Sequence, residues 1–259
     1  RSLNNLKRGK LLSNYFLKIL NRFADKILVI DNEVLKSLNS KNKCTIARNI
    51  LDTKKIKTRS VNDNNFLHVG YIGTFLKYKG VENLIEAVDT LTKKNYKIKL
   101  ILAGSFLKRN ILTRNIFKIF NFENNIKGEL LEKEFIINLG FLKDIRKFYE
   151  KIDILCFPSS LNTTGRQVFE AGFFTKPVII CLKNKNSDGF VNYYNGISYK
   201  HFNSIKELQN SIIYFYNNRK KIKTMGLNGK KIAVKNNKKD LNIKKMNAIY
   251  NGIINNNIF

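Results

Sequence analysis

The stretch DILCFPSSLNTTGRQVFEAGFFTKPVIIC, residues 153–181, decides the fold. It begins and ends with short apolar runs, 153–157 and 177–181, which have the length and character of buried strands. Between them, residues 166–175 carry apolar side chains three or four positions apart, which predicts a helix. Strand, helix and strand in this order form a crossover unit, which joins parallel strands. The stretch therefore predicts one unit of a parallel α/β sheet.

The same alternation runs through the chain from Phe66 onward. Further strands are predicted at 67–72, 97–103 and 135–139, with helices near 80–93, 107–120 and 143–150. Three more helical stretches follow near 203–218, 228–235 and 239–255. Five strands suffice for a doubly wound sheet, so we expect an α/β fold with a Rossmann-like parallel sheet.

The residues before Phe66 predict a partial second α/β domain. Residues 11–24 have the apolar stripe of an amphipathic helix, for which packing against a sheet is the simpler interpretation and membrane contact the other. Two short apolar runs follow at 26–30 and 44–47. Residues 51–66 are polar and lack periodicity, as expected of an interdomain linker.

The net charge is strongly positive, with 48 Lys and Arg against 19 Asp and Glu. Such a charge attracts polyanions, which makes nucleic acid a class of partner to consider. The excess is mainly Lys and is spread from end to end, without zinc-ligand spacing, an RNA-recognition aromatic pair or a basic heptad helix. We predict a solvated cationic surface and no nucleic-acid partner, with contact to an anionic membrane as the next interpretation.

Neither a metal site nor a membrane span is predicted. The two histidines, His68 and His201, are far apart, and no cysteine pair has metal-ligand spacing. No apolar stretch reaches the roughly 18 residues of a spanning helix, and the N-terminus has no signal-peptide pattern. A cytoplasmic protein fits these features, with the inner face of the membrane as a further location. The first residue is Arg1 and not Met, so we expect preceding residues to be missing.

Ligands of open parallel sheets bind beyond the carboxyl ends of the strands, so the loops there are candidate sites. The loop GTFLKYKG, from Gly73 to Gly80, offers a close backbone approach, a helix start and the Lys79 charge for a phosphate. A plain tight turn is the alternative. The turn at Gly104 is a weaker candidate of the same kind.

The loop from Pro158 carries the strongest case. Thr163 or Thr164 can cap a helix starting near Gly165, which aims the amides of Gly165 and Arg166 at an anion. Glu170 follows about a turn and a half later, and its carboxylate can accept two hydrogen bonds from a diol such as ribose. The alternative is an ordinary surface carboxylate paired with a lysine.

These residues resemble the motif P-S-x-x-E-G-F-G-x-x-x-x-E-A-M-A-x-G-x-P-V of glycosyltransferase family 4, whose members have the GT-B architecture. The matched positions are Pro158, Ser159, Gly165, Glu170, Ala171, Pro177 and Val178. The first loop is similar to the family element G-R-L-x-x-x-K-G, and the pair Asn195 and Gly196 to its Asn-Gly turn. The resemblance covers about residues 66–256 in order.

The resemblance implies a role for each site residue. Lys79 would bind the diphosphate of a nucleotide sugar, Glu170 the ribose hydroxyls, and the amides around Gly165 the phosphate or sugar. The implied donor-binding residues are Gly73, Thr74, Lys79, Gly104, Thr164, Gly165, Arg166 and Glu170. The implied catalytic residues are Lys79, Asn162 and Glu170.

Two positions depart from the family pattern. The arginine that usually follows the first glycine is Thr74 here, so one phosphate contact is absent or comes from Lys77 or Arg166. The first glutamate of the family's pair falls on Asn162, whose amide can bind sugar hydroxyls but carries no charge. Either an altered donor or a loss of activity follows.

By this resemblance, residues 1–65 are a remnant of an acceptor-side domain with its linker, 66–238 bind the nucleotide sugar, and 239–259 form a helix that packs back on the N-terminal part. The implied reaction transfers a sugar from a nucleoside diphosphate to a saccharide or lipid-linked acceptor with retention, in cell-envelope glycan synthesis. No cofactor and no metal are implied. The alternative is a degenerate, non-catalytic domain that regulates or scaffolds a partner.

Overall fold

The structure is a computed structural model, and it describes residues 18–19, 22–30, 32, 35, 43–47, 65–106, 126–237 and 239–256. The chain divides into two compact units. One comprises Lys55–Ala233, and the other comprises Arg1–Lys54 with Val234–Phe259. The predicted helix at 107–120 and most of the predicted helix at 11–24 and linker at 51–66 lie outside the described residues. The domain boundaries from the sequence stay predictions.

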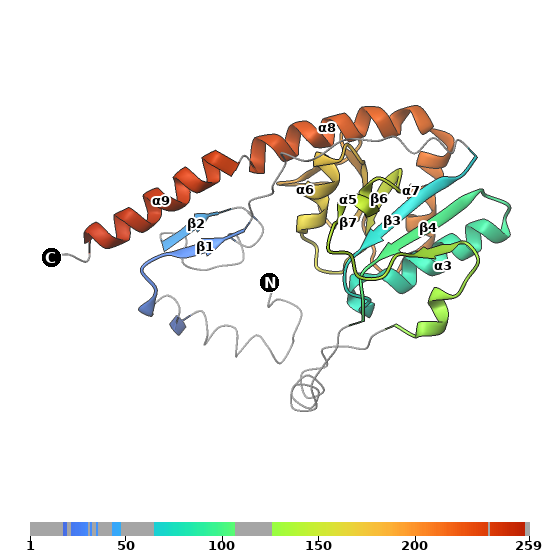
Figure 1. Cartoon of the computed structure of the whole chain (residues 1–259), viewed down its shortest axis with the longest axis horizontal. Helices are drawn as coiled ribbons and strands as arrows, with labels where there is room; N and C mark the ends of the chain where they lie inside the picture. Colours follow the sequence, from blue (N-terminus) through green and yellow to red (C-terminus); the bar gives the residue numbers. More distant parts are fainter. Residues whose placement is uncertain are drawn as a thin grey trace. The chain divides into compact units, whose positions relative to one another are not determined.

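A six-stranded parallel sheet forms the centre of the larger unit (Figure 1). Its strands are β3 (Leu67–Ile72), β4 (Ile98–Ala103), β5 (Ile136–Asn138), β6 (Ile154–Phe157), β7 (Val178–Cys181) and β10 (Gly196–Tyr199). The spatial order is β10-β7-β6-β3-β4-β5, and every pair is parallel. The Rossmann-like parallel sheet predicted from the sequence is thereby confirmed.

The strand order contains one reversal, between β3 and β6. The chain lays down β4 and β5 on one side of β3, then returns to place β6 on the other side. The strands β3 and β6 are parallel neighbours, so the loops that follow them leave the sheet side by side, at the carboxyl ends of the strands. In doubly wound sheets this reversal opens a crevice where ligands bind.

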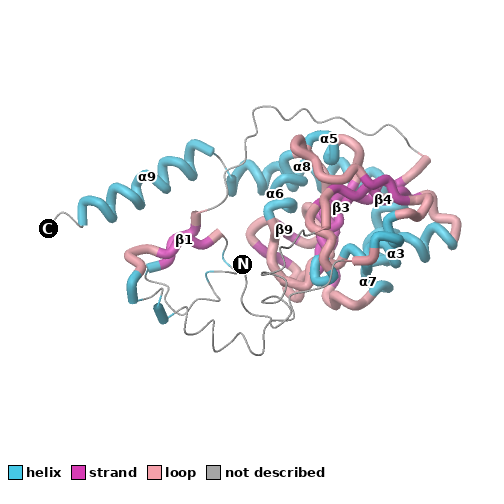
Figure 2. Tube along the Cα trace, turned by 60° about the horizontal axis from the view of Figure 1, so that its bottom comes forward, coloured by secondary structure: helices cyan, strands magenta, loops and turns pink. Residues whose placement is uncertain are grey.

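Helices cover both faces of the sheet (Figure 2). On one face, α3 (Val81–Lys93) and α7 (Ile205–Asn217) share a buried cluster with Leu100 and Leu102 of β4. On the other face, α5 (Arg146–Tyr149) and α6 (Arg166–Phe173) share a second cluster with Ile101 and Ala103. Alternate β4 side chains thus point to opposite helical layers, as the pleat requires.

Helix α8 (Arg219–Asn237) contacts α6 through glycines. A Cβ on Gly172 of α6 would lie 2.6 Å from the carbonyl oxygen of Gly229, so no side chain fits at residue 172. A Cβ on Gly226 would collide with the carbonyl oxygen of Thr175, just after α6. This close crossing fixes the distance between α8 and α6, the helix that carries Glu170.

The remaining described elements are short, apart from the last helix. Strands β1 (Ile27–Val29) and β2 (Cys44–Ile46) form a parallel pair, and β8 (Asn186–Ser187) and β9 (Phe190–Val191) an antiparallel one. The 3-10 turns are η3 (Lys77–Lys79) and η4 (Gly128–Leu131). Helix α9 spans Lys239–Asn256.

The sequence prediction was wrong in several elements of the described chain. It missed the sixth strand β10 and the β8–β9 pair, and it began α8 at residue 228 where the helix starts at Arg219. It also made the helix at 143–150 too long, because Asp144 accepts hydrogen bonds from Arg146 and stays outside α5. Strand β10 has only four residues, GISY, and directly follows a turn. The sequence therefore has no long apolar run at this position from which a strand could be predicted.

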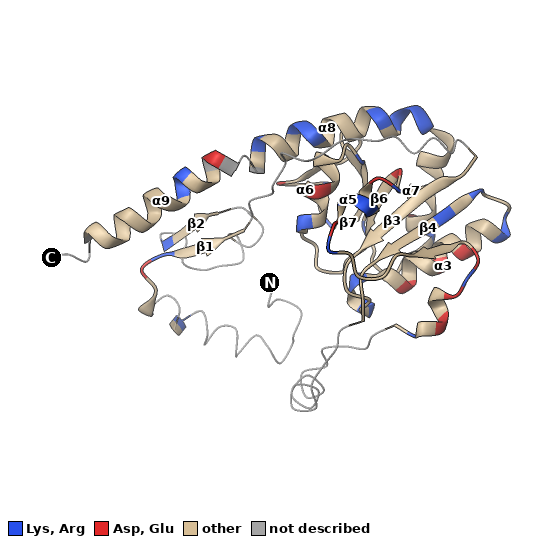
Figure 3. Cartoon of the chain, in the orientation of Figure 1, with Lys and Arg blue, Asp and Glu red and all other residues tan. Residues whose placement is uncertain are grey.

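Basic residues are distributed over several elements (Figure 3), and α8 carries seven of them and no acid. Membrane contact at this surface stays a prediction. Within the described residues, no helix has both the length and the apolar character needed to cross a membrane.

The α6–α8 crossing predicts opposite effects for two alanine substitutions in one helix. Gly226→Ala should lower the free energy of unfolding by about 2 kcal/mol, because its methyl group meets the Thr175 carbonyl. Gly229→Ala is the matched control: its Cβ would lie 3.4 Å from the nearest atom, an ordinary contact, and helix propensity favours alanine by about 1 kcal/mol. Urea denaturation of both variants measures this, and equal losses would contradict the described crossing.

Candidate functional site

The loops that leave β3 and β6 are joined at the switch point. The amide of Ser160 in the β6 loop donates to the carbonyl oxygen of Tyr78 in the β3 loop, 3.0 Å away. Gly80 has a φ of 76°, and a Cβ there would collide with the carbonyl oxygen of Pro158. Only glycine allows this approach without strain. Two candidate segments from separate parts of the sequence therefore meet at the switch point.

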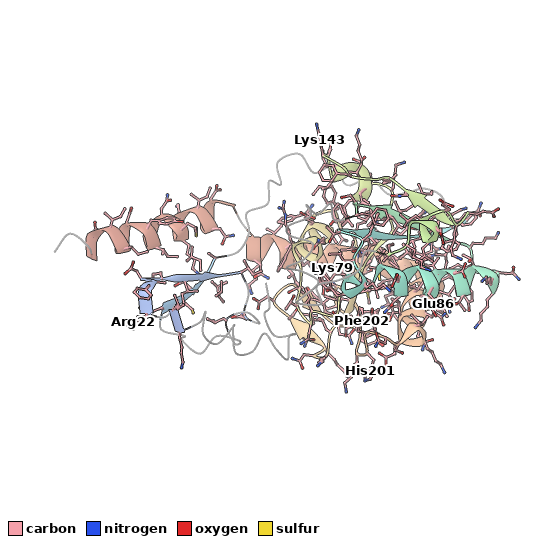
Figure 4. The ribbon with its side chains drawn as sticks, turned by 90° about the horizontal axis from the view of Figure 1, so that it is seen from below. Arg22, Lys79, Glu86, Lys143, His201 and Phe202 are labelled. Atoms are coloured by element: carbon pink, nitrogen blue, oxygen red, sulfur yellow. The ribbon has the colours of Figure 1, made fainter. Side chains whose placement is uncertain are left out.

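Lys79 lies at this junction (Figure 4). It ends the η3 turn, and its Nζ lies 5.1 Å from the centroid of the Tyr78 ring, within cation–π range. Gly80 then turns into the left-handed region and begins α3. The residue that accepts the hydrogen bond from Ser160 thus also contacts the Lys79 ammonium.

The ends of β3 and β4 approach closely through two glycines. The Gly73 amide donates to the carbonyl oxygen of Ala103 at 2.9 Å, and a Cβ on Gly104 would collide with the Gly73 carbonyl oxygen. Gly104 has a φ of 145°, which only glycine adopts easily. Thr74 follows, and its carbonyl oxygen accepts a hydrogen bond from the Tyr71 hydroxyl at 2.7 Å. The predicted residues Gly73, Thr74 and Gly104 thus lie in closely packed backbone at the ends of β3 and β4.

The predicted threonine cap of α6 is wrong. The N-cap is Gly165, and no side chain accepts a hydrogen bond from the first turn. Thr164 is buried, and its hydroxyl lies 3.4 Å from that of Ser187, toward the loop after β7. Gly165 itself leaves no room for a side chain, because a Cβ would lie 2.6 Å from the Phe157 ring. The uncapped first turn presents its amides and positive dipole at the switch point.

Glu170 is a buried carboxylate, with 8% of its side chain exposed. Its Oε1 lies 2.7 Å from Arg166 Nε, and its Oε2 accepts a hydrogen bond from the Tyr149 hydroxyl at 3.2 Å. Burial raises the pKa of Glu170, while Arg166 and Tyr149 act in the opposite direction. The alternative of an exposed carboxylate paired with a lysine does not fit this environment. Tyr149 is the partner that the sequence analysis missed.

Asn162 is a structural brace in the β6 loop. Its φ is 39°, a left-handed conformation that Asn tolerates better than most residues. Its Oδ1 accepts a 2.6 Å hydrogen bond from the backbone amide of Lys183, in the loop after β7. The side-chain oxygen that the sequence analysis assigned to sugar hydroxyls is thus already engaged. The Nδ2 group can still donate to a ligand.

The nine predicted site residues all lie at the ends of β3, β4 and β6 or in the first turns of α6. The backbone contacts join the β3 loop, which carries Lys79, to the β6 loop, which leads into α6. In the described parts of the chain, no group of three or more His, Cys, Asp or Glu side chains could hold a metal ion. Independence from metal stays a prediction.

A Rossmann-like sheet with closely packed glycines at the strand ends, an uncapped helix start and a lysine at the switch point is typical of α/β domains that bind nucleotides. Comparison with known proteins agrees. The family model "Glycosyl transferases group 1" matches residues 52–232. The chain belongs to this family.

Curated and solved relatives extend the comparison. The chain is 25% identical over 183 residues to the capsular polysaccharide biosynthesis glycosyltransferase CapM of Staphylococcus aureus, covering 70% of this chain and 45% of CapM. It is similar in fold to TarM of S. aureus (TM-score 0.69, 17% identity, 96% of this chain and 48% of TarM). It also resembles HepE of Anabaena (TM-score 0.71, 18% identity, 96% of this chain and 67% of HepE). The chain spans about half the length of CapM and TarM.

The Asn162 brace predicts a difference between two substitutions. Asn162→Ala removes the acceptor for the Lys183 amide and places alanine at positive φ, so we expect a loss of about 2 kcal/mol in the free energy of unfolding. Asn162→Asp keeps an oxygen acceptor and a residue that tolerates this conformation, so its loss should stay within about 0.5 kcal/mol. Thermal and urea unfolding report both values. Equal stability of the two variants would show that the hydrogen bond from the Lys183 amide to Asn162 does not stabilise the fold.

Burial of Glu170 predicts a pH-dependent cost to stability. A carboxyl whose folded pKa is raised contributes most at acidic pH and loses that contribution as the pH rises through the folded pKa. Glu170→Gln should therefore match the wild type near pH 4 and exceed it by about 1 kcal/mol at pH 8. Urea denaturation across this range is the measurement. A variant less stable than wild type at pH 8 would show that the pairing with Arg166 and Tyr149 outweighs desolvation.

Proposed function

We propose that this chain is the donor-binding half of a retaining glycosyltransferase that moves a sugar from a nucleoside diphosphate to a saccharide or lipid-linked acceptor. The observation that carries the proposal is the junction of the β3 and β6 loops, where Ser160 binds the Tyr78 carbonyl beside Lys79. Membership in the glycosyl transferases group 1 family supports it. So do the relatives, since CapM is named for capsular polysaccharide biosynthesis and HepE was solved with UDP and glucose.

The proposed chemistry uses fixed positive charge at the leaving group. When the bond between the anomeric carbon and the phosphate oxygen breaks, negative charge grows on the diphosphate. The Lys79 ammonium and the uncapped amides of α6 would stabilise that charge without a metal. Glu170, once its oxygens are available, would bind the ribose hydroxyls and fix the nucleoside. We place the whole reaction in the cytoplasm, in cell-envelope polysaccharide synthesis.

Asn162 bears on the choice of donor. Because its oxygen binds the Lys183 amide, its free group is a hydrogen-bond donor where the family pattern has a carboxylate acceptor. We therefore propose an altered donor sugar, one that presents an acceptor at this point. The acceptor substrate would bind mainly to the rest of the protein, since the chain covers 45% of CapM. This chain by itself should bind donor and turn over slowly.

Titration calorimetry with UDP-, GDP- and ADP-glucose tests donor binding. One of the three should bind saturably, and Lys79→Ala and Glu170→Ala should each weaken it by about tenfold or more, the value of a lost charge-assisted hydrogen bond. Lys94→Ala is the matched control, because this exposed lysine caps the far end of α3, before β4 and at the opposite sheet edge.

Absence of saturable affinity for all three donors would contradict the proposal and favour the non-catalytic alternative. Unchanged affinity in Glu170→Ala would remove the role assigned to this carboxylate. On the full-length protein, the anomeric configuration of the product, determined by NMR, checks retention.

A further inference from the structure

In the arrangement that the structure shows, both oxygens of Glu170 are already engaged by protein groups. A carboxylate that holds two vicinal hydroxyls must present both of its oxygens. Here Oε1 pairs with Arg166 Nε at 2.7 Å and Oε2 accepts from the Tyr149 hydroxyl at 3.2 Å. With 8% of the side chain exposed, little of the carboxylate is open to a ligand. Release of one of the two partners would open the carboxylate to the nucleoside, and the oxygen that keeps its partner can still accept a second hydrogen bond.

Arg166 is the partner that can move. Tyr149 is fully buried, and its ring stacks on Phe174 with a centroid distance of 4.6 Å and an interplanar angle of 9°. Its hydroxyl also lies 3.2 Å from the Gln167 carbonyl oxygen, which fixes its position. The Arg166 side chain is 57% exposed, and within the described chain Glu170 is the carboxylate with which it pairs. Moving Arg166 leaves the stacking of Tyr149 on Phe174 in place.

Arg166 also lies where the diphosphate is proposed to bind. It is the first residue of α6, directly after Gly165, at the end of the helix whose amides have no side-chain cap. A diphosphate carries more charge than one carboxylate, and a guanidinium binds two phosphate oxygens at once. The diphosphate is thus a stronger partner for Arg166 than Glu170 is.

We propose that Arg166 is a positioning residue that exchanges partners when the donor binds: it holds Glu170 in the unliganded chain, then transfers to the diphosphate and leaves Glu170 to the ribose. This inference rests on the proposed function and deepens it. Burial raises the pKa of Glu170, so a carboxylate left alone would be unfavourable, and the ribose hydroxyls replace the lost hydrogen bonds. Phosphate binding and nucleoside binding become coupled, although they use different residues.

The coupling can be measured on the unmodified chain with the two halves of the ligand supplied separately. Inorganic pyrophosphate should occupy Arg166 and thereby tighten uridine binding by roughly two- to fivefold, the range expected for release of one partly exposed ion pair. Ligand-observed NMR titration of uridine, with and without saturating pyrophosphate, gives the two dissociation constants. If GDP or ADP binds in place of UDP, guanosine or adenosine replaces uridine.

Arg166→Leu provides the second measurement. Without the guanidinium, Glu170 has no competing ion pair, so the nucleoside should bind about threefold more tightly than to wild type while UDP binds about tenfold more weakly. The pyrophosphate effect should disappear. Arg219→Leu is the matched control, because Arg219 also begins a helix and faces an acid, Asp153 at 3.7 Å, but contacts the Phe66 carbonyl before β3, at the other sheet edge.

Each outcome decides a separate point. If UDP binds but pyrophosphate leaves the affinity for uridine unchanged or weaker, the exchange is overturned and the donor-binding proposal stands. If Arg166→Leu weakens UDP without strengthening uridine, Arg166 is a phosphate contact only, which also overturns the exchange. If none of UDP, GDP and ADP binds the wild type, the proposed function itself fails.

Discussion

The candidate site depends on one close approach between two loops. Gly80 lies directly against the Pro158 carbonyl, and the Ser160 amide binds the Tyr78 carbonyl at 3.0 Å. These contacts can form because β3 and β6 are neighbours in the sheet although more than eighty residues separate them in the chain. Without this approach, Lys79 and the start of α6 would belong to unrelated loops. The glycine at residue 80 is thus as important to the site as the charged residue before it.

The sequence predicts the sheet well because its signals are local. Apolar runs of four to six residues alternate with helical periodicity, and a polypeptide with that alternation has few ways to bury both patterns other than a parallel sheet between helices. The last strand, Gly196–Tyr199, was not predicted because it is short, contains a serine and does not directly follow a helix. Its position comes from pairing with β7, which is a tertiary property.

The placement of the candidate residues in the fold was predictable to a similar depth, while their roles stay predictions. The glycines and the charged residues stand at strand ends, and strand ends are visible in the sequence. The pairing of Arg166 with Glu170 could also have been found, since residues four apart share a helix face. Neither the Tyr149 hydrogen bond nor the Asn162 brace has such a signal, because each joins segments about twenty residues apart that only the folded chain brings together. For Glu170 and Asn162 the sequence suggests contacts with a ligand, whereas the structure shows contacts with other residues of the protein.

Tyr78 links the backbone contact between the two loops to the position of the Lys79 ammonium. Its carbonyl ties the β6 loop, and its ring lies under the Lys79 ammonium at 5.1 Å. A displacement of this residue would alter loop spacing and the direction of the cation together. We expect departure of a bound anion and separation of the two loops to share a single kinetic barrier. The residence time of such a ligand would then be set by the backbone around an aromatic residue that need not touch it.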